Sequence, residues 1–120
     1  MRRDLEKLFA EYVNLPLECD GLTRVLSYLL DQNKIHHRVM QGSVKVVDKN
    51  FRPHFWIELP DGHIVDYRAR MWLGNKPNVP NGVFKPDDFP EAEYDGHITS
   101  MRMTEQMFRI LTMKWPRMPA

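Results

Sequence analysis

The N-terminal part of the chain carries apolar residues at helical spacing in two successive segments. In residues 2–14 the apolar positions are Leu5, Leu8, Phe9, Tyr12 and Val13, which predicts an amphipathic helix. The sequence Asn-Leu-Pro-Leu at residues 14–17 interrupts this pattern. A second helical pattern runs from Cys19 to about Asn33, with Leu22, Val25, Leu26, Leu29 and Leu30 on its apolar stripe. We therefore expect the second helix to begin close to Cys19.

The pattern then changes to that of strands. Residues 36–47 are rich in β-branched side chains and predict a strand, with a bulge or bend at Gly42 and a turn at residues 48–50. Residues 53–67, PHFWIELPDGHIVDY, contain two apolar segments separated by Leu-Pro-Asp-Gly. Pro60 pre-sets φ at the second turn position and Gly62 tolerates a positive φ. This predicts a hairpin with a three-residue loop and a bulge.

The register of that hairpin decides which polar residues are neighbours. If Leu59 faces His63, Trp56 faces Asp66, and His54 becomes a diagonal neighbour of Asp66, with backbones roughly 7 to 8 Å apart. The opposite face is almost wholly apolar and is expected to be the core side: Phe55, Ile57, Leu59, Val65 and Tyr67. A two-residue loop would instead place His54 and Asp66 on opposite faces. The turn residues favour the first register.

The C-terminal half is harder to assign. Residues 75–91 contain Pro77, Pro80, Pro86 and Pro90, which predicts a long loop without regular structure and a candidate rim or lid for a site. Residues 94–101 predict a last strand, and Thr104 is expected to cap a final helix through about Trp115. Helices that precede an antiparallel run of strands indicate an α+β class, here as a single domain over residues 1–120.

Composition and charge narrow the function classes. The chain is 42% hydrophobic and 28% charged with a formal net charge of +1, so nothing favours binding to nucleic acid or to a membrane surface. No stretch is apolar enough to span a bilayer and the first residues lack the apolar block of a signal peptide, so a cytoplasmic location is expected. A single cysteine excludes an internal disulfide framework and a multi-thiolate zinc site.

The same cysteine is the first candidate for chemistry. A thiol at the first turn of a helix faces free backbone N–H groups and the positive end of the helix dipole, both of which favour the thiolate. A nearby imidazole would favour it further, and a carboxylate bonded to the far ring nitrogen would fix the orientation of that imidazole. Cys19, His54 and Asp66 are therefore the candidate constellation.

Two segments carry a family resemblance: CDGLTRVLSYLLDQNKIHHRVMQG and, further on, HFWIELPDGHIVD. Together they resemble the transglutaminase-like branch of the papain-like cysteine enzymes. The resemblance covers residues 19–67 and implies that Cys19 is the nucleophile, His54 the general base and acid, and Asp66 the residue that orients His54. Trp56 matches the aromatic residue after the histidine and is a candidate substrate-binding residue.

The resemblance also implies an activity, and the chain departs from the family pattern at two positions. It implies a transglutaminase-like fold with hydrolase or acyltransferase activity, most commonly that of a cysteine protease, on a peptide, a protein or another amide, without a cofactor. Tyr67 stands where many members have proline. No glutamine precedes the cysteine as an oxyanion donor, so Asn14 or the Cys19 backbone N–H is the candidate.

Other interpretations stay open at this stage. A lone helical cysteine is most often a packing residue, and the same fold without activity would be a protein-binding module that uses the proline-rich loop and exposed aromatic residues. His36 and His37 suggest a metal-binding regulator, but adjacent strand residues point to opposite faces, so only one of them can join a given site. We therefore expect no metal.

Overall fold

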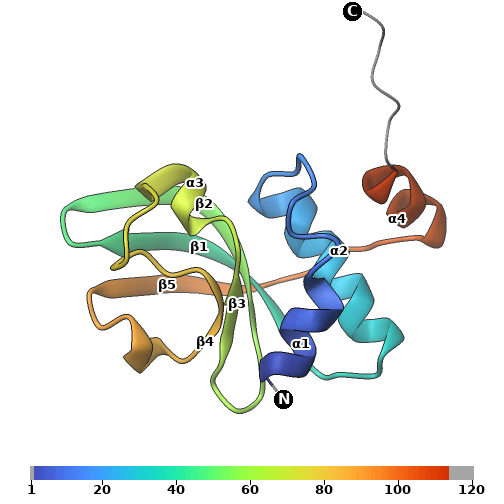
Figure 1. Cartoon of the computed structure of the whole chain (residues 1–120), viewed down its shortest axis with the longest axis horizontal. Helices are drawn as coiled ribbons and strands as arrows, with labels where there is room; N and C mark the ends of the chain where they lie inside the picture. Colours follow the sequence, from blue (N-terminus) through green and yellow to red (C-terminus); the bar gives the residue numbers. More distant parts are fainter. Residues whose placement is uncertain (1, 114–120) are drawn as a thin grey trace, which may run out of the picture.

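The structure, a computed structural model, describes residues 2–113 as an antiparallel five-stranded sheet with helices at its sides (Figure 1). The strand order is β4-β3-β2-β1-β5, and every pairing is antiparallel. The helices are α1 (Arg2–Phe9), α2 (Cys19–Gln32), α3 (Ala69–Leu73) and α4 (Glu105–Thr112). The strands are β1 (Arg38–Val46), β2 (Lys49–Glu58), β3 (Ile64–Asp66), β4 (Gly82–Phe84) and β5 (Ala92–Thr99). The predicted α+β class is confirmed.

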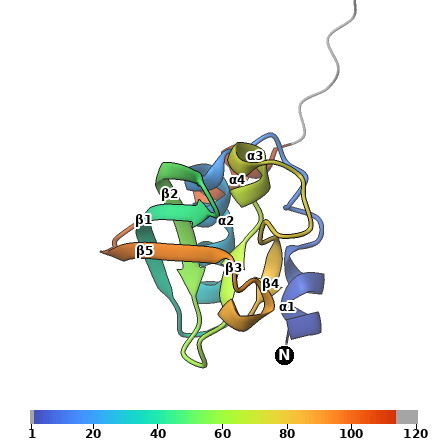
Figure 2. The ribbon, with the colours of Figure 1, turned by 90° about the vertical axis from the view of Figure 1, so that its left-hand side faces the viewer.

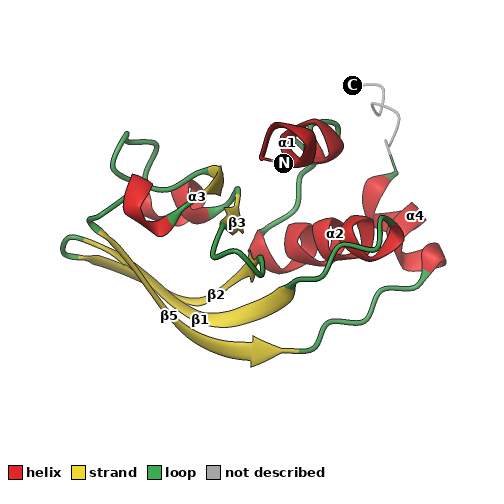
Figure 3. Cartoon of the chain, turned by 90° about the horizontal axis from the view of Figure 1, so that it is seen from below, coloured by secondary structure: helices red, strands yellow, loops and turns green. Residues whose placement is uncertain are grey.

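The main core lies between the first two helices and one face of the sheet. In Figure 3, α1 and α2 lie on the same side of the curved strands β1 and β2. Buried residues of α1 and α2 pack there on Val39, Ile57, Leu59, Val65 and Val83. The face predicted to be the core side of the hairpin therefore does face the core, although Phe55 is only half-buried. Among residues 2–113, no helix has the length and the apolar character needed to cross a membrane.

The opposite face of the hairpin is also buried, which the sequence did not predict. Met40, Trp56, Ile64 and Phe84 form a second buried cluster, against which Tyr94 packs. The cause is the curvature of the sheet, which brings its two edge strands together: the ring centroids of Phe84 in β4 and Tyr94 in β5 are 6.2 Å apart. In Figure 2 the edge strand β5 lies at the front. His54 and Asp66 thus lie in an interior.

The predicted hairpin turn and register are confirmed. The Leu59 N–H donates to the His63 carbonyl at 2.8 Å, and the Gly62 N–H donates to the Leu59 carbonyl at 3.0 Å. Gly62 has a φ of 95°, the left-handed conformation that the turn requires. The pairing of Ile57 with Val65 gives the register in which Trp56 faces Asp66. The predicted bulge also occurs, because the β1–β2 register shifts between Gly42 and Val44.

Several element boundaries differ from the predictions. The first helix ends at Phe9 and is followed by turns, whereas the pattern predicted a helix to residue 14. The turn predicted at residues 48–50 lies one residue earlier, because Lys49 already pairs with Val46. The second strand of the hairpin ends at Asp66, and the short helix α3, which the sequence analysis missed, follows it. These shifts are at element ends, where local patterns are weakest.

The proline-rich segment is more ordered than predicted. Residues 75–91 contain the edge strand β4 and the 3-10 helix η1 (Pro86–Asp88), so the expectation of a loop without regular structure is wrong. Proline is tolerated at the start of a helix and beside an edge strand, and no proline lies within residues 82–84. At the C-terminal end, the Thr104 side chain accepts from the Met107 N–H at 3.0 Å, as predicted for a cap. Trp115 lies outside the described residues.

Two glycines let β1 and β5 approach closely beside the candidate site. Gly42 pairs with Gly96, and a Cβ at Gly96 would lie 2.5 Å from the Gln41 carbonyl oxygen and 2.7 Å from the Trp56 ring. We expect Gly96→Ala to lower the free energy of unfolding by about 1 to 3 kcal/mol, measured by urea denaturation, because the strands must separate.

Gly21→Ala in α2 is the control. A Cβ there would meet Leu17 at an ordinary 3.4 Å, so alanine should be neutral or stabilising. Equal unfolding free energies for the two variants would contradict the close approach at Gly96.

Candidate active site

The carboxylate of Asp66 collects four hydrogen bonds at the end of β3. Its Oδ2 accepts from His54 Nε2 at 2.6 Å and from the Tyr94 hydroxyl at 2.8 Å. Its Oδ1 accepts from the backbone N–H groups of Arg68 at 2.9 Å and Ala69 at 3.1 Å, at the start of α3. Asp66 is 3% exposed and its carboxylate is held from both sides, so its orientation is fixed.

The imidazole of His54 is fully buried next to this carboxylate. Burial alone would lower the pKa of His54, but the charge and the hydrogen bond of Asp66, with contributions of the same sign from Cys19, raise it from 6.5 to about 9. The ring is therefore held as an imidazolium at neutral pH. Since Nε2 is bonded to Asp66, the ring nitrogen that remains for other chemistry is Nδ1.

Cys19 lies beside that imidazole at the first residue of α2. The Cys19 side chain contributes to the raised pKa of His54, which places the thiol near the ring. His54 Nδ1 is buried and has no hydrogen-bond partner among the described residues, so the thiol is near the ring but not hydrogen-bonded to it. The cap residue Glu18 makes no side-chain hydrogen bond to the helix, whereas the Gly21 N–H donates to the Asp20 carboxylate at 2.8 Å. The Cys19 N–H at the helix start is therefore the candidate donor for a ligand.

The structure thus brings together the three residues that the sequence analysis grouped as a site. His54 and Asp66 are in direct contact and Cys19 is adjacent to the ring. A one-residue slip of the hairpin would have separated His54 from Asp66, and the observed register excludes that slip. Their catalytic role stays a prediction.

A buried arginine, Arg68, connects the Asp66 carboxylate to the segment before Cys19. The Arg68 guanidinium donates to the carbonyl oxygens of Leu17 at 2.6 Å, Val13 at 2.8 Å and Leu15 at 3.0 Å. These carbonyls belong to the segment that leads from α1 into α2 and ends just before Cys19. Burial lowers the pKa of Arg68 below its usual value, because the opposing effect of the Asp66 and Cys19 charges is smaller. Arg68 thus fixes the segment before the cysteine and places a positive charge near the thiol.

The two predicted substrate-binding residues lie in different surroundings. Trp56 is 1% exposed, and its ring packs against His54 with centroids 5.9 Å apart and against Tyr94 at 4.9 Å. It therefore supports the imidazole from behind, and its buried Nε1 has no hydrogen-bond partner. Asn14 is exposed in the segment held by Arg68, between the bonded carbonyls of Val13 and Leu15.

A line of aromatic rings leads from His54 to the surface. Phe51 packs edge-on against the imidazole at 5.9 Å, and Trp72 of α3 stacks on Phe51 at 4.4 Å with an interplanar angle of 4°. The bulge in the β1–β2 ladder makes this possible, because Phe51 and His54 are three residues apart and would otherwise point to opposite faces. Trp72 is 40% exposed and its neighbour Met71 is 51% exposed.

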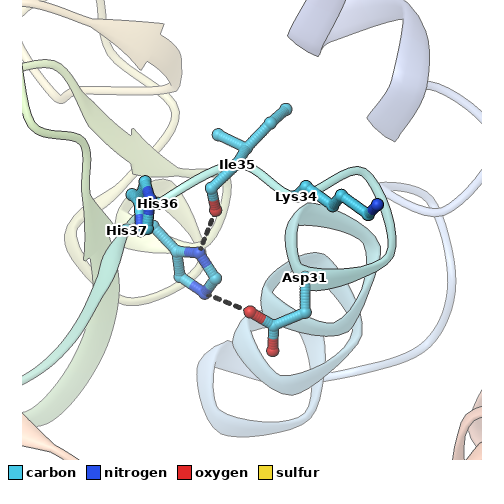
Figure 4. A pocket seen from close by; sticks show the side chains of 5 residues that line it. All are labelled: Asp31, Lys34, Ile35, His36 and His37. Atoms are coloured by element: carbon cyan, nitrogen blue, oxygen red, sulfur yellow. Dashed lines mark hydrogen bonds and ion pairs between the residues drawn. The ribbon is translucent and has the colours of Figure 1, made fainter.

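The histidines considered for metal binding lie elsewhere. Figure 4 shows His37 turned toward α2: its Nδ1 is 2.9 Å from the Ile35 carbonyl oxygen and its Nε2 is 3.9 Å from an Asp31 carboxylate oxygen. The same Nε2 lies 2.7 Å from the Ser27 hydroxyl, so the ring is satisfied by the protein itself. Within the described residues, no group of three or more His, Cys, Asp or Glu side chains could hold a metal ion.

Sequence reasoning missed two members of the site. Tyr94 comes from the far edge strand, and no pattern along the chain indicates that β5 curves back over Asp66. Arg68 lies beyond the end of β3, and its guanidinium points to carbonyls some fifty residues earlier in the chain. Both contacts are long-range, so a local pattern carries no signal for them.

The candidate site is closed in this conformation. Cys19 is 6% exposed, and none of five surface pockets of about 210 to 590 Å³ is lined by Cys19, His54 or Asp66, although Tyr94 lines one of them. No protein-family model matches this chain, and comparison with curated proteins and with solved structures likewise gives no match. Any assignment of function therefore depends on the geometry above.

Proposed function

We propose that the protein is a small cysteine hydrolase or acyltransferase that cleaves an amide bond through Cys19, His54 and Asp66, on a transglutaminase-like variant of the α+β fold. The observation that carries the proposal is the 2.6 Å contact between His54 Nε2 and Asp66 Oδ2, with the Cys19 thiol beside the same ring. A buried imidazolium between a carboxylate and a helix-terminal thiol is the arrangement that activates a cysteine.

The first half of the reaction acylates the cysteine. The Cys19 thiolate attacks the amide carbonyl carbon, a C–S bond forms and the carbonyl π electrons move to oxygen. As the tetrahedral intermediate collapses, the C–N bond breaks and the departing nitrogen takes the proton from His54 Nδ1. Asp66 keeps Nε2 protonated and the ring in place, so neutral His54 is left with Nδ1 free as a base.

The second half transfers the acyl group. Water or an amine attacks the thioester carbon, and His54 Nδ1 accepts its proton. The C–S bond then breaks, and the products are a carboxylic acid or a new amide, the Cys19 thiolate and the His54 imidazolium. The cycle returns all protons to their starting places, so it needs no cofactor.

The start of α2 supplies the candidate oxyanion site. The Cys19 backbone N–H is at a helix N-terminus, where the first N–H groups have no helical partners. The Arg68 guanidinium adds positive charge near the same place. Asn14 is a second proposed donor, because Arg68 holds the carbonyls on both sides of it. Entry of a peptide or another amide requires the segment before Cys19 or α3 to move, since the site is closed.

The thiol chemistry gives a direct test. At pH 6.5, we expect iodoacetamide to alkylate Cys19 at least about tenfold faster in the native protein than in His54→Ala, because the imidazolium stabilises the attacking thiolate. The measurement is the rate of mass increase of the intact chain, which has a single cysteine.

His63→Ala is the matched control. His63 also contacts an aspartate, Asp61, at 2.8 Å, but at the tip of the hairpin, so its loss should leave the alkylation rate unchanged. Equal rates in the native protein and in His54→Ala would contradict an activated thiol.

A second candidate function is a protein-binding module on the same fold. The observation that favours it is the pair of exposed apolar side chains on α3, Met71 and Trp72, together with the closed site. Such a module has no use for an activated thiol, so the alkylation comparison above separates the two: a rate that does not depend on His54 would favour binding alone.

A further inference from the structure

The hydroxyl of Tyr94 shares an acceptor with the proposed catalytic histidine. Asp66 Oδ2 accepts from the Tyr94 hydroxyl at 2.8 Å and from His54 Nε2 at 2.6 Å. We propose that Tyr94 is a positioning residue of the Cys19, His54 and Asp66 site, which holds the carboxylate in place and weakens its hold on the imidazolium proton. This inference rests on the proposed function for its role in catalysis, but the effect on His54 follows from the contacts alone.

The ring of Tyr94 is packed between aromatic side chains, with its hydroxyl bonded to the acid. It packs edge-on against Trp56, with centroids 4.9 Å apart and planes at 64°, and lies 6.2 Å from the Phe84 ring. Trp56 in turn packs against the imidazole. Tyr94, Trp56 and His54 are thus one packed group around the Oδ2 oxygen of Asp66, contributed by β5, β2 and β3.

The hydroxyl acts as a permanent donor. Burial, together with the charge and the hydrogen bond of Asp66, raises the pKa of Tyr94 well above 10. The proton therefore stays on the phenol oxygen wherever His54 titrates, and Tyr94 does not exchange it with the site. The charged and titratable groups that act on His54 are Asp66 from β3 and Cys19 from α2. Tyr94 from β5 and Arg68 at the start of α3 act on Asp66, and Arg68 also acts on Cys19.

The consequence for His54 has a definite sign. A hydrogen bond to a carboxylate oxygen stabilises its negative charge and leaves less of that charge for a second donor. Without the Tyr94 hydroxyl, Asp66 Oδ2 accepts a hydrogen bond from His54 alone, so the pKa of His54 rises. Proton release from Nδ1 to the leaving group becomes harder, although the ring keeps its place.

The test is an NMR titration of the His54 ring in the full chain. In Tyr94→Phe, which keeps the ring and removes only the oxygen, we expect the pKa of His54 to rise by about half a unit, roughly a threefold gain in proton affinity. Tyr67→Phe is the matched control, because Tyr67 is also partly buried but packs against Phe9 at 6.2 Å on the other face of the hairpin. Tyr67→Phe should leave the His54 titration unchanged.

A second measurement has the opposite sign and leaves the fold intact. Replacing the four tyrosines with 3-fluorotyrosine makes each hydroxyl a stronger donor, so the pKa of His54 should fall, and it should not change when the same replacement is made in Tyr94→Phe. An unchanged His54 titration in both experiments, or an equal shift in Tyr67→Phe, would overturn the role of Tyr94. Failure of the alkylation test would overturn the enzyme proposal and leave this result standing.

Discussion

Asp66→Asn is expected to lower the pKa of His54 by more than two units, from about 9 to below 6.5. Burial lowers this pKa, and the negative charge of Asp66 is the largest effect that opposes it. An amide carries no charge, so only the smaller contributions of Cys19 would oppose burial, and the ring would be neutral at pH 7. Cys19 would then lose its cationic partner, and its alkylation at pH 6.5 should slow about as much as in His54→Ala.

The same change should alter how stability depends on pH. The pKa of His54 is raised in the folded protein, so its contribution is fully present below about pH 6.5 and is lost as the pH rises from 6.5 to 9. The difference of about 2.5 units corresponds to roughly 3 kcal/mol. Urea denaturation at pH 6 and at pH 9.5 should show this loss in the native protein and not in Asp66→Asn.

An exposed pair of the same type provides the control. Asp61 and His63 are 2.8 Å apart, but Asp61 lies in solvent at the hairpin tip. Asp61→Asn should therefore keep the pH dependence of the native protein. If Asp61→Asn and Asp66→Asn gave the same dependence, the buried pair would not be its source.

Arg68→Met is expected to lower the free energy of unfolding by about 3 to 5 kcal/mol. The methionine keeps most of the apolar stem, but the carbonyls of Val13, Leu15 and Leu17 lose a charged donor in a partly buried segment. The change also frees the segment that precedes Cys19, so the thiol should lose its fixed position beside His54. Urea denaturation and the alkylation rate at pH 6.5 measure the two effects.

Arg38→Met separates the role of Arg68 from a general loss of charge. Arg38 is exposed and contacts Glu58 at 3.3 Å on the surface, where an ion pair contributes less than about 1 kcal/mol. The two variants remove the same chemical group. Similar unfolding free energies for both would mean that the guanidinium of Arg68 does not hold the segment before Cys19.

The parts of this structure that local chemistry controls could be predicted from the sequence. The turn after Leu59 follows from a proline and a glycine at fixed offsets, and it sets the register that joins His54 to Asp66. The start of α2 at Cys19 follows from the end of one apolar pattern and the beginning of another. The positions of Cys19, His54 and Asp66 could be predicted because they depend only on the start of one helix and on one short hairpin.

The contacts that depend on the curvature of the sheet could not be predicted from the sequence. The sequence predicts the core on the other side of the hairpin, yet Trp56 and Ile64 are also buried on the His54 side because β4 and β5 close over them. The three residues of β4 lie in a proline-rich segment, and prolines occur beside an edge strand as well as in a loop. The sequence pattern therefore did not distinguish the two. Contacts of Arg68 and Tyr94 depend on how distant segments pack, which no periodicity encodes.

The order in which the chain is synthesised bears on this site. Tyr94, which donates a hydrogen bond to Asp66, follows Cys19 by 75 residues. Arg68, which binds the segment before Cys19, also comes much later in the chain. A growing chain therefore carries the thiol on its first long helix well before the last partner of the acid has left the ribosome. Until then the thiol lies in an unfinished fold, because its surroundings require the chain at least as far as Tyr94.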